Sequence, residues 1–291
     1  MRRSLLFMPA NNAGMLLNAD FLGADAIILD LEDAVSPLEK DAARILARNA
    51  IKTLGYINSD IIVRINALDS PFILDDLREI APLKPSLIMP PKIGTAEDVL
   101  KLDSILNKIE FKNSIERGSL KLIPLIETAL GVENAFEIAS ASKRVSAVLL
   151  GAEDLTADMC CVRTKGGNEI NYSRARVVSA CRAASVDCFD TPFTDVDDDE
   201  GILADAKYAR SLGFSGKAAI SPRHVSVINE VFSPSAKEIE YSIEVMKTIK
   251  MAKAAGKGVV SLRGKMIDAP IVMRAERVLS DAHELGVNID E

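Results

Sequence analysis

The sequence predicts an α/β fold: a (β/α)8 TIM barrel over residues 1–232, followed by a C-terminal helical extension over residues 233–291. Eight short runs rich in Ile, Leu and Val recur along the chain, and longer segments with helical spacing lie between them. The runs are continuously apolar, as expected for strands that face helices on one side and a filled barrel on the other. A length of 291 residues suits one barrel with an appendage.

The expected strands are short and evenly distributed. They cover residues 4–9, 26–32, 60–66, 86–92, 120–127, 147–153, 187–192 and 216–222. The clearest helix candidates between them cover residues 37–54, 96–109, 173–185 and 200–212. No Pro/Gly/Ser-rich linker or internal repeat divides the chain.

The extension is more than a barrel needs. A Lys- and Glu-rich amphipathic helix is expected over residues 236–255, and a second helix over residues 271–285. Between them stands the segment GKGVVSLRGKMIDAP, residues 256–270. We therefore expect residues 233–291 to form a separate appendage to the barrel.

Composition and charge exclude several classes of protein. The net charge is −7 and no long basic face is present, so a nucleic-acid partner is not expected. No apolar run approaches the roughly 20 residues that span a bilayer, so no membrane is expected either. The apolar run in MRRSLLFMPANN is too short for a signal peptide, and the four cysteines form no C-x-x-C pattern. Both features favour a cytoplasmic protein.

The expected strands end mainly in carboxylates. Catalytic groups of such barrels lie at the C-terminal ends of the strands and in the loops that follow. The polar residues at these ends are Asp30, Glu32, Asp33, Arg64, Asn66, Lys92, Glu127, Glu153, Asp154 and Asp190. The two histidines, His224 and His283, lie at none of these ends, which disfavours Ser-His-Asp and Cys-His mechanisms.

Glu127 and Asp154 are the candidate metal ligands. They close adjacent expected strands, which lie about 4.8 Å apart, so both carboxylates can reach one cation. Mg²⁺ prefers one or two carboxylates with water and substrate oxygens in the remaining positions. The alternative is that each carboxylate caps the helix that follows. Spacing alone does not choose between Asp154 and its neighbour Glu153.

Two further groups have alternative interpretations. Arg64 ends the apolar run IIVRIN, and its guanidinium suits a substrate carboxylate or thioester oxygen. Its alternative role is a structural ion pair with Asp30 or Glu32. Lys92 or Lys217, each at a strand end, would support Schiff-base aldolase chemistry instead of metal chemistry.

Seven motifs in this order resemble one known family over residues 3–279. They are RRSLLFMPA (2–10), ILDLEDAV (28–35), VRINALDS (63–70), LIET (125–128), GAEDL (151–155), LGFSGK (212–217) and VVSLRGKMIDAP (259–270). The chain resembles the citrate lyase beta subunits, the citryl-thioester lyases of the HpcH/HpaI aldolase-like family that also includes malyl-CoA and citramalyl-CoA lyases.

The resemblance implies roles for particular residues. It implies Mg²⁺ bound by Glu127 and Asp154, which settles the choice against Glu153, with Glu127 also facing the substrate. It implies that Arg64 binds substrate, and that Glu32 supports metal-bound water with Asp30 beside it. Asp268 would enter the active site of an adjacent subunit, with Asp268 as general acid and Arg64 stabilising charge.

The implied reaction is cleavage of a citryl thioester, citryl-ACP, to oxaloacetate and an acetyl thioester. The implied partners are the acyl carrier protein (gamma) and transferase (alpha) subunits of a citrate lyase complex, and further copies of the chain in a homo-oligomer, a trimer. Ala10 and Ser221 depart from residues common in the family, so acyl carrier protein and CoA both stay open as carriers. Malyl-CoA cleavage, citramalyl-CoA cleavage and a catalytically silent scaffold role also stay open.

Overall fold

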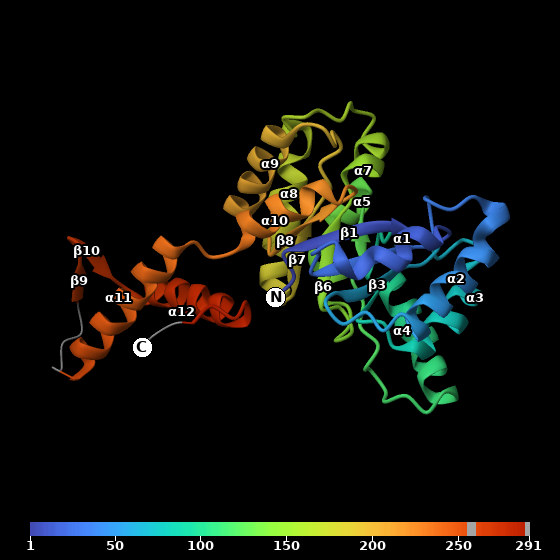
Figure 1. Ribbon diagram of the computed structural model, residues 1–291, viewed down its shortest axis with the longest axis horizontal. Helices are drawn as coiled ribbons and strands as arrows, with labels where there is room; N and C mark the ends of the chain where they lie inside the picture. Colours follow the sequence, from blue (N-terminus) through green and yellow to red (C-terminus); the bar gives the residue numbers. More distant parts are fainter. Residues whose placement is uncertain (255–259, 289–291) are drawn as a thin grey trace. The chain divides into compact units, whose positions relative to one another are not determined.

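The computed structural model describes residues 1–254 and 260–288 (Figure 1). The chain divides into two compact units, one of residues Arg2–Glu230 and one of Val231–Glu291 with Met1. No helix in the described ranges is both long and apolar enough to cross a membrane.

The first unit contains an eight-stranded parallel sheet. Its strands are β1 (Ser4–Pro9), β2 (Ala26–Asp30), β3 (Asp60–Arg64), β4 (Leu87–Met89), β5 (Leu125–Ile126), β6 (Ala147–Leu150), β7 (Asp187–Asp190) and β8 (Gly216–Ala219). They are hydrogen-bonded in the order β4-β3-β2-β1-β8-β7-β6-β5. Parallel bridges from Leu122 to Ile88 and to Val145 join the two ends of this order. The predicted (β/α)8 barrel is confirmed.

Strands β4 and β5 are shorter than expected. Residues 86–92 and 120–127 were the expected ranges, but regular pairing covers only Leu87–Met89 and Leu125–Ile126. Pro90, Pro91 and Pro124 interrupt the two segments. Proline has no N–H to donate to a neighbouring strand, so regular pairing stops beside it.

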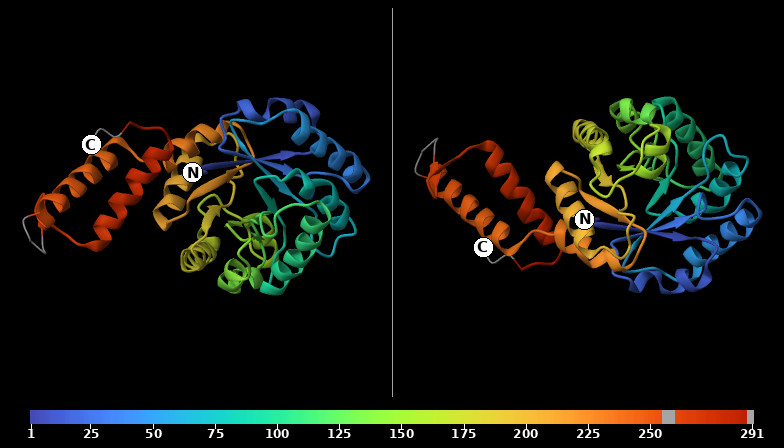
Figure 2. Two further views of the ribbon diagram at one scale, coloured as in Figure 1. Left: turned by 90° about the horizontal axis from the view of Figure 1, so that it is seen from below. Right: turned by 90° about the horizontal axis from the view of Figure 1, so that it is seen from above.

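Helices surround the strands of this unit (Figure 2). The longer ones are α2 (Lys40–Thr53), α3 (Ile73–Ile80), α4 (Ala96–Lys112), α8 (Asn171–Ala184), α9 (Asp199–Leu212) and α10 (Arg223–Phe232). Short helices follow several strand ends: α1 (Ala13–Asn18), α5 (Ala129–Glu133), α6 (Ala135–Ser140) and α7 (Ala152–Asp158). Single 3-10 turns lie at Ala19–Phe21, Pro37–Glu39, Ala81–Leu83 and Asn168–Ile170.

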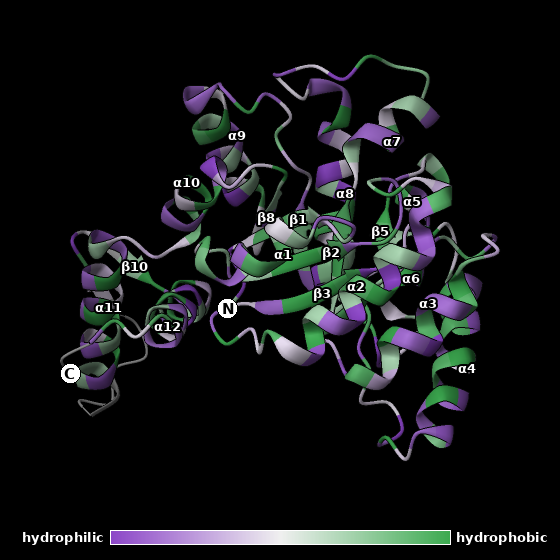
Figure 3. Cartoon of the chain, turned by 45° about the vertical axis from the view of Figure 1, so that its right-hand side comes forward, coloured by the Kyte–Doolittle hydropathy of each residue, from purple (hydrophilic) through white to green (hydrophobic). Residues whose placement is uncertain are grey.

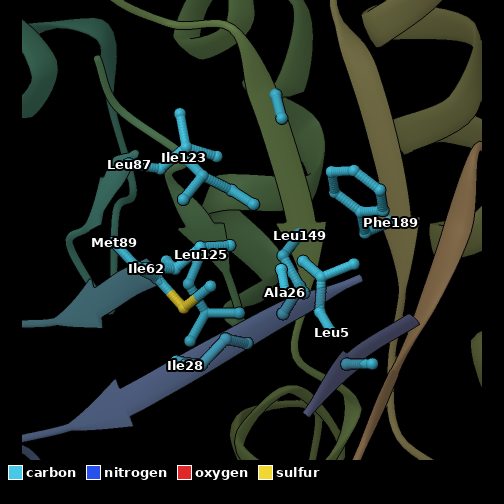
Figure 4. Packing of buried hydrophobic residues seen from close by; sticks show 12 residues of the cluster. Leu5, Ala26, Ile28, Ile62, Leu87, Met89, Ile123, Leu125, Leu149 and Phe189 are labelled. Atoms are coloured by element: carbon cyan, nitrogen blue, oxygen red, sulfur yellow. The ribbon is translucent and has the colours of Figure 1, made fainter. Parts of the chain in front are cut away.

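Apolar side chains from all eight strands fill the interior of the barrel (Figure 4). The cartoon coloured by hydropathy shows hydrophobic residues, in green, along the central strands (Figure 3). They are Leu5, Ala26, Ile28, Ile62, Leu87, Met89, Ile123, Leu125, Ala147, Leu149, Phe189 and Ala218. Burying each larger member stabilises the fold by about 1.5–3 kcal/mol. This core fills the barrel, and the charged groups of the candidate site lie beyond it, at the C-terminal ends of the strands.

The second unit is a helical hairpin with a small sheet. It comprises α11 (Ala236–Ala254), the antiparallel strands β9 (Val260–Leu262) and β10 (Lys265–Ile267), and α12 (Ala269–Glu284). Val245, Ile267 and Ala275 form its core. Both residues of the tight turn between the strands, Arg263 and Gly264, have positive φ, as two-residue hairpins require. The last residue of the expected helix, 255, and residues 256–259 of the following segment lie outside the described residues.

Candidate active site

A cavity of about 340 Å³ opens at the C-terminal ends of the strands. Its wall combines apolar side chains with the charged groups that end the strands. Its polar and aromatic lining residues include Phe7, Asp30, Asp33, Arg64, Glu127, Glu153, Asp154 and Thr191. The structure therefore brings Asp30, Arg64, Glu127 and Asp154 together in one place, whereas the predicted residues Glu32, Asn66, Lys92 and Asp190 do not line this cavity.

Glu127 follows β5 directly and is only 3% exposed. Its Oε1 accepts a hydrogen bond from the backbone N–H of Lys92 at 2.8 Å. Burial, followed by the negative charge of Asp154, raises the pKa of Glu127 to about 8, although Arg64 acts in the opposite direction. The charged form of Glu127 is therefore poorly stabilised by its surroundings, and a bound cation would stabilise it.

Gly151 is required by the position of Glu127. A Cβ on this residue would lie 2.8 Å from Glu127 Oε2 and 2.9 Å from Glu127 Cβ. Real Cβ atoms do not approach other atoms so closely, so a side chain here would displace the carboxylate. In the loop after β6, the backbone of Gly151 therefore packs directly against Glu127.

Asp154 lies in a helix and not at the end of a strand. Strand β6 ends at Leu150, and the expected strand of residues 147–153 is wrong at its end, since Glu153 and Asp154 occupy the first turn of α7. Consecutive helical residues are about 100° apart, whereas strand residues face opposite sides, so both side chains reach the cavity wall. Glu153 Oε1 lies 3.5 Å from Arg163 Nε, while Asp154 Oδ2 lies 3.9 Å from Lys92 Nζ.

Neither Glu127 nor Asp154 is a helix cap, so the alternative interpretation of these two carboxylates is wrong. The N-cap of α5 is Thr128, whose side chain accepts from Gly131, and the residue at the N-cap of α7 is Gly151. Within the described ranges, neither carboxylate accepts a hydrogen bond from the helix that follows it. Both are left to interact across the cavity.

Lys92 supplies a positive charge to these carboxylates. It adopts a left-handed backbone conformation, with φ of 55°. Its Nζ lies 2.6 Å from Glu32 Oε1, 3.7 Å from Asp33 Oδ1 and 3.9 Å from Asp154 Oδ2. Burial lowers the pKa of Lys92, but the hydrogen bond to Glu32 and the surrounding negative charges raise it above the ordinary value overall. Lys92 is therefore a charged ammonium and a poor Schiff-base nucleophile.

Lys217 is also unsuited to Schiff-base chemistry. Its side chain is 0% exposed, and its Nζ lies 2.6 Å from both Asp190 Oδ2 and Asp205 Oδ2. It donates a further hydrogen bond to the carbonyl of Thr191 at 2.6 Å. Lys217 is not among the residues that line the cavity, so a carbonyl substrate there would not meet it.

Arg64 is held in a structural ion pair and still reaches the cavity. Its Nε and Nη2 donate to the two oxygens of Asp30 at 2.7 and 2.6 Å, and its guanidinium lies 5.1 Å from the centre of the Phe7 ring. Asp30 also accepts from the backbone N–H groups of Glu32 and Ala34. The ion-pair alternative is thus present, and it fixes the guanidinium at the cavity wall.

Glu32 has one buried oxygen without a hydrogen bond. Its Oε1 accepts from Lys92, whereas Oε2 lies 3.1 Å from Arg64 Nη1 without hydrogen-bonding geometry. Burial raises the pKa of Glu32, although Arg64 and Lys92 both act to lower it. Oε2 therefore keeps an unused acceptor position beside Arg64.

The residues present fit a magnesium ion that has few protein ligands. No group of three or more His, Cys, Asp and Glu side chains in the described part of the chain is arranged to hold a metal. Mg²⁺ commonly uses one or two carboxylates and takes its other oxygens from water and substrate. Glu127 and Asp154 offer two such oxygens, and the short supply of positive charge around Glu127 favours a cation there.

Asp268 lies in the second unit, at the start of α12. It is exposed, and its side chain accepts from the backbone N–H of Ile271 at 3.2 Å as the N-cap of that helix. Its expected entry into an adjacent subunit stays a prediction. The lining residues that the sequence did not single out include Phe7 and Thr191, because an aromatic ring and a hydroxyl after a strand carry no specific signal.

The model of the HpcH/HpaI aldolase/citrate lyase family matches residues 3–222. The citrate lyase subunit beta of Leuconostoc mesenteroides subsp. cremoris is 41% identical and covers 97% of this chain and 94% of that protein. That of Escherichia coli (strain K12) is 38% identical, covering 98% and 95%. The L-malyl-CoA/beta-methylmalyl-CoA lyase of Cereibacter sphaeroides is 36% identical, covering 98% and 95%.

Solved structures show the same fold. Protein CitE from Mycobacterium tuberculosis, in complex with magnesium, acetoacetate and coenzyme A, has a TM-score of 0.78 and 28% identity over 97% of this chain and 98% of that chain. The citrate lyase beta subunit from M. tuberculosis complexed with oxaloacetate and magnesium has a TM-score of 0.68 and 29% identity over 80% and 97%. A citrate lyase from Burkholderia xenovorans LB400 has a TM-score of 0.88 at 19% identity over 100% and 94%, a likeness of fold alone.

Proposed function

Because the chain belongs to the HpcH/HpaI aldolase/citrate lyase family, we propose that it is a magnesium-dependent carbon-carbon lyase. Its substrate is a citryl thioester, and its products are oxaloacetate and an acetyl thioester. The relatives named citrate lyase subunit beta are 38–41% identical to it, whereas those named malyl-CoA lyases are 35–36% identical. This difference favours the citryl substrate over the malyl alternative.

One observation carries the proposal. Glu127 is buried beside Asp154, faces the cavity, and has a pKa raised to about 8 because burial and negative charge are not offset. A divalent cation between these carboxylates would offset their negative charge. When bound, magnesium would polarise the hydroxyl and carboxylate oxygens of the substrate and lower the pKa of the hydroxyl.

Arg64 is suited to the charge that develops on the thioester. The substrate hydroxyl first loses its proton to water. When the carbon-carbon bond then breaks, the alkoxide becomes the carbonyl of oxaloacetate, and the electron pair of the broken bond passes to the acetyl fragment and gives an enolate oxygen. The guanidinium of Arg64, fixed by Asp30 and packed over Phe7, holds positive charge in place at the wall of the cavity. A donor that is already oriented lowers the barrier more than one that must reorganise.

A proton must then reach the carbon of the acetyl fragment. In this proposal Asp268 of the partner subunit delivers it, and the same residue acts as base in the condensing direction. Asp268 is exposed in a single chain, with a side-chain hydrogen bond only to its own helix in the described part. The burial that a carboxylic acid needs for this role would come from the adjacent barrel.

The proposed assembly follows from the same reaction. The citryl group arrives on the acyl carrier (gamma) subunit, and the transferase (alpha) subunit of a citrate lyase complex recharges it. Copies of this chain form a trimer through the second unit, so that each barrel receives one Asp268. We place the assembly in the cytoplasm, because all four cysteines are free thiols.

The decisive experiment is an assay of the purified chain with citryl-ACP, citramalyl-CoA and malyl-CoA, each with and without EDTA. We expect the highest kcat/KM with citryl-ACP, loss of activity in EDTA and recovery with Mg²⁺. Activity that survives chelation, together with trapping of substrate by borohydride, would establish the Schiff-base alternative. A chain inactive with every thioester would indicate a scaffold and overturn the proposal.

Asp268→Asn tests the subunit-crossing acid. We expect turnover to fall by about a hundredfold or more, the usual contribution of a general acid, while the Kd for Mg²⁺ stays unchanged. Turnover and magnesium titration by calorimetry on the same preparation provide the two readings. Asp281→Asn, on the same helix, is the matched control and keeps full turnover. A fully active Asp268→Asn variant would exclude this role.

A further inference from the structure

Thr191 connects a buried ion-pair network to the candidate metal site. It follows β7, is 1% exposed and lines the cavity. Its Oγ1 accepts a hydrogen bond from the backbone N–H of Ala152 at 3.0 Å. Its carbonyl accepts from Lys217 Nζ at 2.6 Å. Thr191 thus contacts the first residue of α7, the helix that carries Asp154.

Helix α7 has no side-chain cap of its own. The first N–H groups of a helix lack partners within the helix, and a Ser, Thr, Asp or Asn at the N-cap usually satisfies one of them. The N-cap of α7 is Gly151, which must lack a side chain because Glu127 occupies that space. Thr191, from the neighbouring strand, supplies a side-chain acceptor in its place.

Thr191 is itself held rigidly. Lys217, which binds its carbonyl, is buried between Asp190 and Asp205. Arg174 bridges the same two carboxylates, with Nη2 at 2.9 Å from Asp190 Oδ2 and 2.7 Å from Asp205 Oδ1. A nearly fully buried network of two cations and two anions has few alternative arrangements, so the backbone of Thr191 is fixed relative to the barrel.

We propose that Thr191 is a positioning residue for the magnesium site: its hydroxyl fixes the start of α7 and thereby aims Asp154 at the ion beside Glu127. The inference deepens the proposed function and rests on it, since it requires that Glu127 and Asp154 bind Mg²⁺. It assigns no contact between Thr191 and the ion. Without the hydroxyl, the backbone N–H of Ala152 would lose its hydrogen-bond acceptor. The position of Asp154 would then no longer be fixed.

The test compares Thr191→Val with Thr191→Ser in the full chain. Valine keeps the shape and removes the hydroxyl, whereas serine keeps the hydroxyl. Calorimetric titration with Mg²⁺ alone should show a Kd about three- to tenfold weaker for the valine variant, the range expected for one hydrogen bond. Serine should restore most of the affinity.

Thr156→Val is the matched control. Thr156 lies on the same helix, is similarly buried, and donates its hydroxyl to the carbonyl of Ala152 at 2.9 Å, so it gives no support to the N–H groups of the first turn. We expect this variant to alter the melting temperature in EDTA without changing the Kd for Mg²⁺. Should Thr191→Val fail to fold, Thr191→Cys, whose thiol is a weak acceptor, should show the same loss of affinity.

The outcomes separate the two proposals. A wild-type chain that binds no Mg²⁺ would overturn the proposed function, and the role of Thr191 with it. A wild-type chain that binds Mg²⁺, with a Thr191→Val variant of equal affinity, would overturn the role of Thr191 alone. Loss of affinity in Thr156→Val equal to that in Thr191→Val would also overturn it, because any disturbance of α7 would then suffice.

Discussion

Two buried carboxylates at strand ends have opposite surroundings. Asp190, at the end of β7, is 0% exposed and accepts from Arg174 at 2.9 Å and from Lys217 at 2.6 Å. Glu127, after β5, is almost as buried but accepts one backbone N–H, and within the described residues it has no ion-pair partner closer than 4 Å. The charge of Asp190 is therefore neutralised by two cations, whereas the charge of Glu127 is not.

The difference teaches how to recognise a functional acid. Asp190 and Asp205 face Arg174 and Lys217, so two negative charges meet two positive ones. The mouth of the barrel has a different balance. Its carboxylates are Asp30, Glu32, Asp33, Glu127, Glu153 and Asp154. Arg64 and Lys92 form ion pairs with members of this group, Arg163 lies 3.5 Å from Glu153, and Lys40 Nζ donates to the backbone carbonyl of Glu32 at 2.6 Å. The excess of negative charge, rather than burial alone, marks the mouth as a place for a cation.

The largest expected effect is at the mouth. Glu127→Ala and Asp154→Ala should each abolish Mg²⁺ binding and lower turnover by about a thousandfold or more, because several kcal/mol of transition-state stabilisation depend on the ion. Calorimetric titration and turnover measure both effects. Glu153→Ala is the matched control, since this neighbour faces Arg163, and it should keep magnesium affinity. Equal loss in all three variants would remove the distinction between Asp154 and Glu153.

A smaller effect is expected at the closed cluster. Arg174→Met leaves Asp190 and Asp205 with Lys217 as their remaining cation, and breaking a buried pair costs about 3–5 kcal/mol of unfolding free energy. Urea denaturation measures this loss. Arg78→Met removes an exposed pair with Asp75 and should cost less than about 1 kcal/mol. If the two variants were equally stable, the cluster would not hold the fold together.

The smallest effect concerns pH. The pKa of Glu127 is raised to about 8 in the folded, metal-free chain, so the folded state retains a proton that the unfolded chain releases near pH 4.3. This contribution to stability is complete below the unfolded pKa and is lost as pH rises through about 8. Glu127→Gln stays neutral, so in EDTA it should melt a few degrees above the wild type at pH 9 and at the same temperature at pH 4. Melting curves that differ equally at both pH values would contradict the shift.

The sequence predicted the barrel well because its signal is repeated. Eight apolar runs place the strands, but seven of the eight expected ranges extend past the observed C-terminal ends, and β1 alone matches. Prolines beside β4 and β5 and the turn of GAEDL into α7 account for three of these seven. Those ends depend on hydrogen bonds to neighbouring strands, which no local pattern encodes. The sequence also brought Glu127, Asp154 and Arg64 to one mouth, because parallel strand ends converge.

The sequence could not predict how these groups are partnered. Lys92 and Lys217 were equal candidates for a nucleophile, although one contacts the carboxylates of the mouth and the other is enclosed with Asp190 and Asp205. The contact of Thr191 with Ala152 spans 39 positions of the chain. Such pairings arise from tertiary packing, so they become visible only in the folded structure.

The missing side chain at Gly151 has a consequence for the choice of ion. Because the backbone at Gly151 lies directly against Glu127, that carboxylate has little room to shift toward it. Any ion that enters must adapt to the spacing between Glu127, directly after β5, and Asp154, in the first turn of α7. Mg²⁺ tolerates little variation in its short bonds to oxygen, whereas Ca²⁺ accepts looser and longer shells. A rigid backing of this kind favours the smaller and stricter of the two.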